Sequence, residues 1–279
     1  MCSFAVWRES MRNLIKIALY TLLDQMRLKS FYVLLGVSIL FVLHIRTCYG
    51  GRYIVQGQQV DRVTVAWHAS KIAFHVICCG MFLLTALLAM RVFTRDRNDG
   101  SLVLFLSRPV DRWQYVFGRV GGIWILSSLF MFVLHCTIFL IAMSKTGGVI
   151  PGYLLASTVC FINLLFTTLL VCLLSLYMPD FIAALATVGI VAVGFISDGM
   201  HLLMQNKMIQ DAFSGKIHPD PAWWRIIYPK VSLVQRYAVS LIDKSEFHGM
   251  GPVHPVLNVI FFSVIIAGIL YVVFNRREI

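Results

Sequence analysis

Ionisable side chains inside long apolar stretches are the first places where this sequence could perform chemistry. Lys71 and His75 are four residues apart and therefore share one face of a helix. Because a charge inside a membrane is costly, such a residue marks either the path of a transported solute or a long side chain that extends its charge to the membrane surface. Both interpretations stay open for Lys71, and we take Lys71 and His75 as substrate-path candidates.

Other polar residues interrupt the apolar runs further along the chain. Asn163 lies well inside one run and is a third substrate-path candidate, although a hydrogen bond to a neighbouring helix is the favoured role of its amide. Asp198 and His201 are three residues apart, a spacing at which two side chains can share a metal ion. Such pairs also arise by chance, so they are weak metal candidates and no metal site is predicted.

The composition places all of these residues in a membrane protein. The chain has 279 residues, of which 59% are hydrophobic and only 13% charged, whereas soluble domains carry about 25% charged residues. Apolar runs of about 20 residues recur, which is the length of a helix that crosses a bilayer. The sequence therefore predicts an all-α polytopic membrane protein. The net charge is +11. In a membrane protein, basic residues beside the spans set the orientation and bind anionic lipid headgroups, so this charge does not indicate nucleic-acid binding.

The pattern of apolar and polar runs predicts a single transmembrane domain over residues 1–279. Charged residues at helical spacing through 11–29 predict an amphipathic helix in the membrane interface. Six spans are expected at about 31–45, 67–93, 121–143, 153–178, 181–200 and 256–274. A long loop, 201–255, precedes the last span. Within it, 231–242 predicts a short amphipathic helix, and we interpret the loop as a whole as a lid over the span ends rather than an outer gate.

The distribution of basic residues predicts the orientation. The N-terminal segment and the 95–119 connector carry five Lys and Arg residues each, and the C-terminal tail carries two. The short loops on the other side, 46–66 and 144–151, carry three and one. Since Lys and Arg accumulate in cytoplasmic loops, both termini and the 95–119 connector are expected in the cytoplasm of an inner or plasma membrane protein.

The 95–119 connector contains an apolar patch that a simple connection would not need. Asp99-Gly100-Ser101 predicts a turn followed by a helix N-cap, and 102–106 predicts one or two helical turns with an apolar face. Ser107 can cap the next helix, with Pro109 in its first turn. The pattern predicts a short helix across the cytoplasmic face of the bundle that docks onto another protein.

This segment resembles the membrane subunit of type-2 ABC exporters, a class of six-span permeases. Members carry an acidic-Gly-Thr turn, then Leu-Leu-Ser-x-Pro, a basic residue and Gly-Lys. The corresponding residues here are Asp99-Gly100-Ser101, Leu104-Phe105-Leu106-Ser107-Arg108-Pro109, Arg112 and Gly118-Arg119. The segment 227–231 resembles the aromatic-Pro element of the family, and 11–29 fits its elbow helix.

The resemblance implies a partner and a mode of action. The connector would be the coupling helix that sits on a separate ABC ATPase, with two ATPase copies bound to two permease chains, the second permease being most simply the same protein. ATP-driven closure of the ATPases would then open the bundle outward. The residues expected to couple to the ATPase are Asp99, Gly100, Leu102, Leu104, Phe105, Ser107, Arg108, Pro109 and Arg112.

The chain itself lacks the usual ATP-binding motif. No G-x-x-x-x-G-K-S/T is present, and 214–217, Ser-Gly-Lys-Ile, lacks both the first glycine and the hydroxyl residue. We therefore expect no enzyme activity and no cofactor in this chain, with ATP and magnesium bound by the partner subunit. The apolar spans favour a hydrophobic or amphiphilic cargo.

Two alternatives remain from the sequence. A stand-alone membrane enzyme could use Asp198, His201 and other outer histidines as a metal site, although neither H-E-x-x-H nor G-x-S-x-G is present. A membrane anchor could recruit a cytoplasmic protein through the connector without any ATP-dependent cycle. An ATPase that co-purifies would exclude the enzyme, and nucleotide-dependent opening would exclude the anchor.

Overall fold

The computed structural model describes residues 2–48, 54–55, 58–59, 61–98, 110–146, 150, 152–204, 228–247 and 253–276. Nearly all of these residues are helical. The helices are α1 (Cys2–Met26), α2 (Lys29–Cys48), α3 (Arg62–Ala89), α4 (Val92–Asn98), α6 (Arg112–Thr146), α7 (Tyr153–Ser175), α8 (Asp180–Met204), α11 (Val231–Asp243) and α12 (Pro255–Arg276). Strands β1 (Ile54–Val55) and β2 (Gln58–Gln59) form a two-residue antiparallel pairing. The predicted all-α polytopic architecture is confirmed.

Five stretches of the described chain are long and apolar enough to cross a membrane. They are Val63–Asp96, Arg112–Ser144, Tyr153–Ser175, Asp180–Met200 and Pro255–Arg276. A sixth arises if Ser10–Met26 and Phe31–Thr47, which meet at a bend of 70°, count as one broken span. Helices are the expected form of these segments, because a helix satisfies all its backbone hydrogen bonds internally where no water is available.

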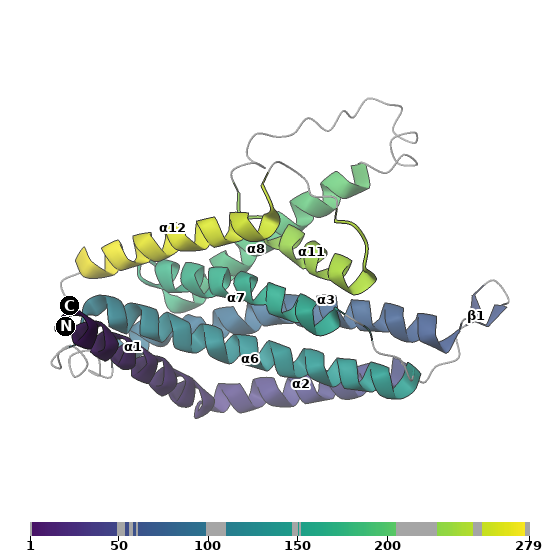
Figure 1. Ribbon diagram of the computed structural model, residues 1–279, viewed down its shortest axis with the longest axis horizontal. Helices are drawn as coiled ribbons and strands as arrows, with labels where there is room; N and C mark the ends of the chain where they lie inside the picture. Colours follow the sequence, from purple (N-terminus) through teal and green to yellow (C-terminus); the bar gives the residue numbers. More distant parts are fainter. Residues whose placement is uncertain are drawn as a thin grey trace.

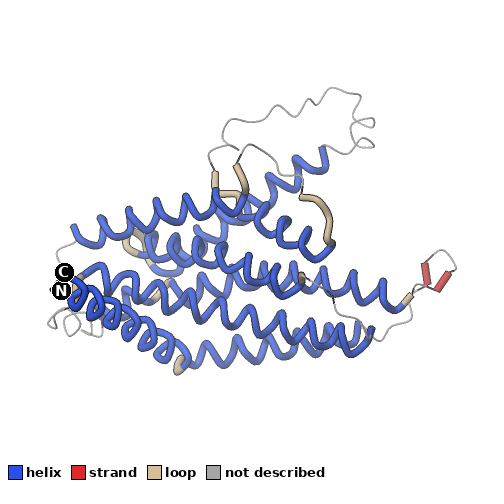
Figure 2. The backbone as a smooth tube through the Cα atoms, in the orientation of Figure 1, coloured by secondary structure: helices blue, strands red, loops and turns tan. Residues whose placement is uncertain are grey.

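The long helices pack into one bundle (Figure 1), and the short turn between α1 and α2 lies partway along it (Figure 2). Helix α7 lies at the centre, packed against α3, α6, α8, α11 and α12. The N-terminal end of α1 and the C-terminal end of α12 lie at the same end of the bundle (Figure 1). Large apolar side chains on α2, α8 and α12 remain exposed, as expected for helix faces that contact lipid.

The N-terminal helix packs against the bundle along one face. Helix α1 begins at Cys2, nine residues before the predicted segment, and packs along α6. Ile17, Ala18 and Thr21 are buried, whereas Leu19 and Leu23 are each 55% exposed. The helix therefore has one face against the bundle and a second apolar face turned outward, rather than a simple division into polar and apolar halves.

The short helix predicted at 231–242 is present as α11, Val231–Asp243. It packs against α3, α7, α8 and α12, and seven of its residues are buried. Helix α11 is therefore part of the bundle, and the lid over the span ends stays a prediction for the rest of the loop. The remainder of the predicted outer loop, 205–227 and 248–252, lies outside the described residues.

Candidate coupling site

The structure divides the 95–119 connector differently from the sequence prediction. Its first residues belong to α4, which ends at Asn98, and its last eight residues form the start of α6, which begins at Arg112. Only 99–111 connects the two helices. Residues 99–109, which include every predicted coupling residue except Arg112, lie outside the described residues. The described part of the site therefore consists of the two helix ends that flank this connection, the end of α4 and the start of α6.

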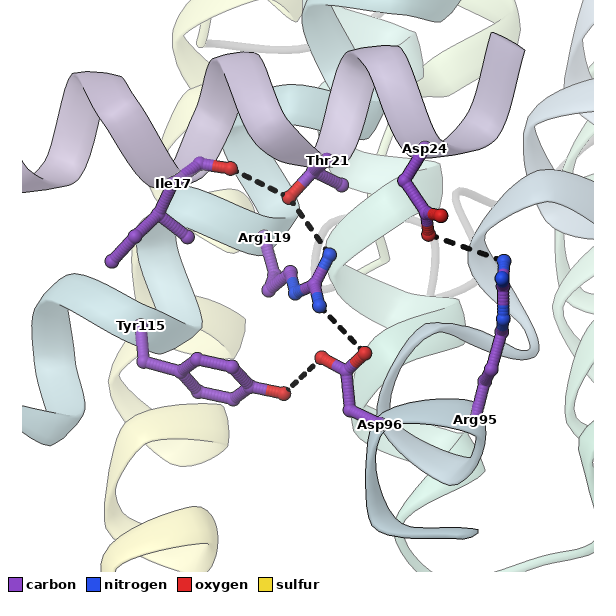
Figure 3. Close-up of polar contacts among 7 residues, drawn as sticks. All are labelled: Ile17, Thr21, Asp24, Arg95, Asp96, Tyr115 and Arg119. Atoms are coloured by element: carbon purple, nitrogen blue, oxygen red, sulfur yellow. Dashed lines mark hydrogen bonds and ion pairs between the residues drawn. The ribbon is translucent and has the colours of Figure 1, made fainter. Parts of the chain in front are cut away.

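A buried ion pair joins these two helix ends. Arg119 of α6 donates from Nη2 to Oδ1 of Asp96 of α4 over 2.6 Å, and the hydroxyl of Tyr115 donates to Oδ2 of the same carboxylate (Figure 3). Arg119 also donates from Nη1 to Oγ1 of Thr21 on α1 over 3.2 Å. Only 2% of Arg119 and 5% of Asp96 are exposed. Three helices therefore meet at one charged pair.

The surroundings of this pair satisfy the conditions under which buried charges are tolerated. Two desolvated charges need close pairing and further hydrogen bonds, because each ion loses its water on burial. Both oxygens of Asp96 accept hydrogen bonds from cationic or hydroxyl donors. The guanidinium carbon of Arg119 also lies 5.3 Å from the ring centre of Tyr20 and 5.8 Å from that of Tyr115, within the range of cation–π attraction.

Further polar contacts surround the pair on the same helix ends. Arg95 of α4 forms an ion pair with Asp24 of α1 at 3.1 Å (Figure 3), with both side chains partly exposed. Gln114 of α6 donates to Ser10 of α1 over 2.7 Å. The remaining described coupling candidate, Arg112, donates to the carbonyl of Asn275 near the end of α12 over 3.0 Å. The start of α6 is therefore connected to α1, α4 and α12.

Two glycines allow α1 to approach α6 closely beside the ion pair. A Cβ at Gly122 would lie 2.6 Å from the carbonyl oxygen of Ala18, and one at Gly118 would lie 2.8 Å from Cγ2 of Ile17. Glycines four residues apart on one helix face permit this close approach. Gly118 belongs to the Gly-Arg pair that the sequence analysis assigned to the connector, and the structure places it in a helix contact.

Sequence reasoning missed most of this cluster. Arg119 was recognised as part of a motif, but it was expected in a cytoplasmic connector, whereas it is buried inside the bundle. Asp96, Tyr115 and Thr21 were not singled out. The available signal was the presence of an acid, Asp96, and a base, Arg119, at facing ends of consecutive apolar runs, where a charge in a membrane protein is expected to have a partner.

The substrate-path candidates Lys71 and His75 lie beside α11. Lys71 pairs through Nζ with Oδ2 of Asp243 at 3.1 Å and lies 3.7 Å from the ring centre of Trp67. His75 is exposed, and its Nδ1 lies 2.9 Å from the carbonyl oxygen of Lys71. Lys71 therefore joins α3 to the C-terminal end of α11, a role that neither interpretation of the sequence included.

Asn163 and Asp198 hold the opposite end of α11. The amide of Asn163 donates to the carbonyl of Val231 over 3.0 Å, which is the helix-to-helix bond favoured from the sequence. Asp198 accepts hydrogen bonds from the hydroxyls of Tyr228 and Ser232. The structure therefore uses this carboxylate as an anchor for α11. The side chain of His201 lies outside the described part of the chain, within which no three His, Cys, Asp or Glu residues gather as metal ligands.

A bundle of apolar spans, with one consecutive pair of spans joined by a buried charged cluster, defines a polytopic helical membrane protein. The sequence profile of the ABC-2 family transporter proteins matches residues 15–279, which include the five unbroken apolar stretches of span length found among the described residues. The chain belongs to this family of membrane proteins. No curated protein matches it closely enough to be reported as a relative.

Proposed function

We propose that this chain is the permease subunit of an ABC exporter, driven by a separate ATPase through the 95–119 segment. Membership of the ABC-2 family supports the permease class. The observation that carries the coupling role is the buried Asp96–Arg119 pair, because it joins the two helix ends from which the connection at 99–111 extends.

The contacts around this pair explain how a displacement of the connection would spread. Separating α4 from α6 would leave Asp96 and Arg119 buried without their opposite charges, which is strongly unfavourable. The two helices therefore move together when the connection is pushed. Thr21 and Asp24 bind Arg119 and Arg95, so α1 follows them as part of one rigid body. A displacement of the connection by the ATPase would therefore reorient the spans that contain α4 and α6 together with α1.

The partners follow from the same proposal. Two ATPase copies would bind two permease chains, most simply two copies of this protein, and the ATPases would hold ATP and magnesium. Both termini and the connection would face the cytoplasm. In support, the ends of α1, α4, α6 and α12 meet at one end of the bundle, where Gln114 contacts Ser10 and Arg112 contacts Asn275.

Co-purification with the ATPase tests the docking role of the connection. Leu104→Glu and Phe105→Glu place charges in its apolar patch, and we expect loss of ATPase association while insertion into the membrane is preserved. Val55→Glu, in the short hairpin outside the bundle, is the matched control and should leave the complex intact. A complex that survives both connector substitutions would place the docking site elsewhere.

A further inference from the structure

A cavity of about 320 Å³ lies between α3 and the C-terminal half of α11. This part of α11 lies towards the end of the bundle opposite the two chain termini (Figure 1). The cavity is lined by His75, Arg236, Val239, Ser240, Asp243, Ser245, Glu246 and Phe247. It is separate from the coupling site and shares none of its residues.

The lining of this cavity carries opposite charges that are separated along α11. Arg236 and Asp243 are seven residues apart on α11, which corresponds to about 10 Å along the helix axis. Glu246 adds a second carboxylate at the Asp243 end, and the apolar side chains of Val239 and Phe247 form part of the wall. A ligand with an anionic group at one end and a cationic group at the other matches this distribution.

The Asp243 carboxylate indicates which kind of cationic group the ligand carries. Its Oδ2 is paired with Lys71, whereas its buried Oδ1 has no hydrogen-bond partner. A buried acceptor without a donor is unfavourable. Asp243 lines the cavity, and because the terminal torsion of an Asp side chain is broad, its carboxylate can rotate to meet a donor there. A primary ammonium supplies the missing N–H donor, whereas a trimethylammonium group has none.

The Arg236 side chain defines the other end of the ligand. It is exposed, and among the described residues it has no ion-pair partner within 4.0 Å. Its planar guanidinium binds the oxygens of a phosphate through two parallel hydrogen bonds. A phosphate here and an ammonium at Asp243 would place the short carbon linker between them against Ser240 and Val239.

We propose that this cavity binds a phosphoethanolamine group, with its ammonium at Asp243 and its phosphate at Arg236. A membrane phospholipid with this headgroup and free phosphoethanolamine are the two sources of that chemistry. Binding requires neither ATP nor an ATPase subunit, so this proposal stands or fails independently of the coupling role.

Binding to the purified full-length chain in detergent tests the proposal, with calorimetry and four probes. The probes are short-chain phosphatidylethanolamine, the matching phosphatidylcholine and phosphatidylglycerol, and O-phosphoethanolamine. We expect phosphatidylethanolamine to bind about tenfold tighter than phosphatidylcholine, since one charge-assisted hydrogen bond contributes roughly that factor. Competition by O-phosphoethanolamine would identify the headgroup alone as sufficient, whereas binding of the lipid only would identify the membrane as the source.

Two variants test the location without disturbing the Lys71–Asp243 pair. Arg236→Ala removes the phosphate-binding group from an exposed position, and Val239→Trp fills the cavity without changing its charge. Both should weaken phosphatidylethanolamine binding about tenfold or more, while the exposed controls Arg46→Ala and Asp61→Asn leave it unchanged. Equal binding of phosphatidylcholine, tightest binding of phosphatidylglycerol, or unaltered binding by both cavity variants would overturn the proposal.

Discussion

Arg119 and Asp96 form a buried ion pair that connects the start of α6 to α4 across the connection at 99–111. The two residues are 23 positions apart in the chain, and Nη2 of Arg119 lies 2.6 Å from Oδ1 of Asp96. The segment expected to receive the force of an ATPase therefore begins and ends on helices that are held together by charge.

Removing one member of this pair should destabilise the protein strongly. Asp96→Asn leaves the buried guanidinium without its counter-charge, and we expect a loss of about 3–5 kcal/mol in the free energy of unfolding. Asp24→Asn is the control, because the Asp24–Arg95 pair is partly exposed and should contribute about 0–1 kcal/mol. Thermal unfolding in detergent measures both. A loss for Asp96→Asn no larger than that for Asp24→Asn would contradict the assigned importance of the pair.

Arg119→Lys should leave assembly of the complex with the ATPase intact but weaken the coupling of the permease to ATP hydrolysis. Lysine keeps the positive charge opposite Asp96, but it lacks the planar fork that contacts Asp96 and Thr21 together. We expect the complex with the ATPase to assemble, while stimulation of ATP hydrolysis by the permease falls. Thr21→Val, which removes only the contact to α1, should show a smaller decrease in the same assay. Unchanged stimulation in Arg119→Lys would show that charge alone is sufficient.

Two adjacent glycines in α6 should respond in opposite ways to alanine. A Cβ at Gly122 would lie 2.6 Å from the Ala18 carbonyl oxygen, so Gly122→Ala forces α1 away and should cost about 1–3 kcal/mol. A Cβ at Gly121 would meet no atom within 4 Å. Gly121→Ala should therefore stabilise the helix by up to about 1 kcal/mol. Unfolding midpoints of the two variants test this difference, and equal shifts would argue against close packing of α1 on α6.

Loss of the Asn163 amide should loosen the N-terminal end of α11. Asn163→Leu removes the bond to the Val231 carbonyl, and helix-to-helix bonds in membranes contribute about 0.6 kcal/mol and at most about 1.7. We expect faster hydrogen exchange at the start of α11 with little change in α12. Thr158→Val is the control on the same helix, because Thr158 is exposed and bonds only to its own helix at Leu155. Equal exchange in both variants would indicate that Asp198 alone holds this end.

Much of the helical plan is readable from the sequence. The span expected at 153–178 is Tyr153–Ser175, that expected at 256–274 is Pro255–Arg276, and the short helix expected at 231–242 is Val231–Asp243. These boundaries depend on local properties, since Gly152 and Pro255 stand at the start of apolar runs, where each helix begins. The burial of α11 within the bundle was not predicted, because burial of an amphipathic helix depends on which other helices surround it.

The amino-acid sequence by itself determined that the chain is a bundle of membrane-spanning helices, because the length and apolarity of each run are sufficient for a helix to cross a bilayer. It also singled out Asn163 as a polar residue inside a span and included Arg119 in a family motif. Only the tertiary structure decided their partners. Whether Arg119 meets Asp96 depends on the rotation, tilt and spacing of α1, α4 and α6, and these are set by packing at positions such as Gly118 and Gly122. Such pairing results from the whole bundle, so no single segment of the sequence contains it.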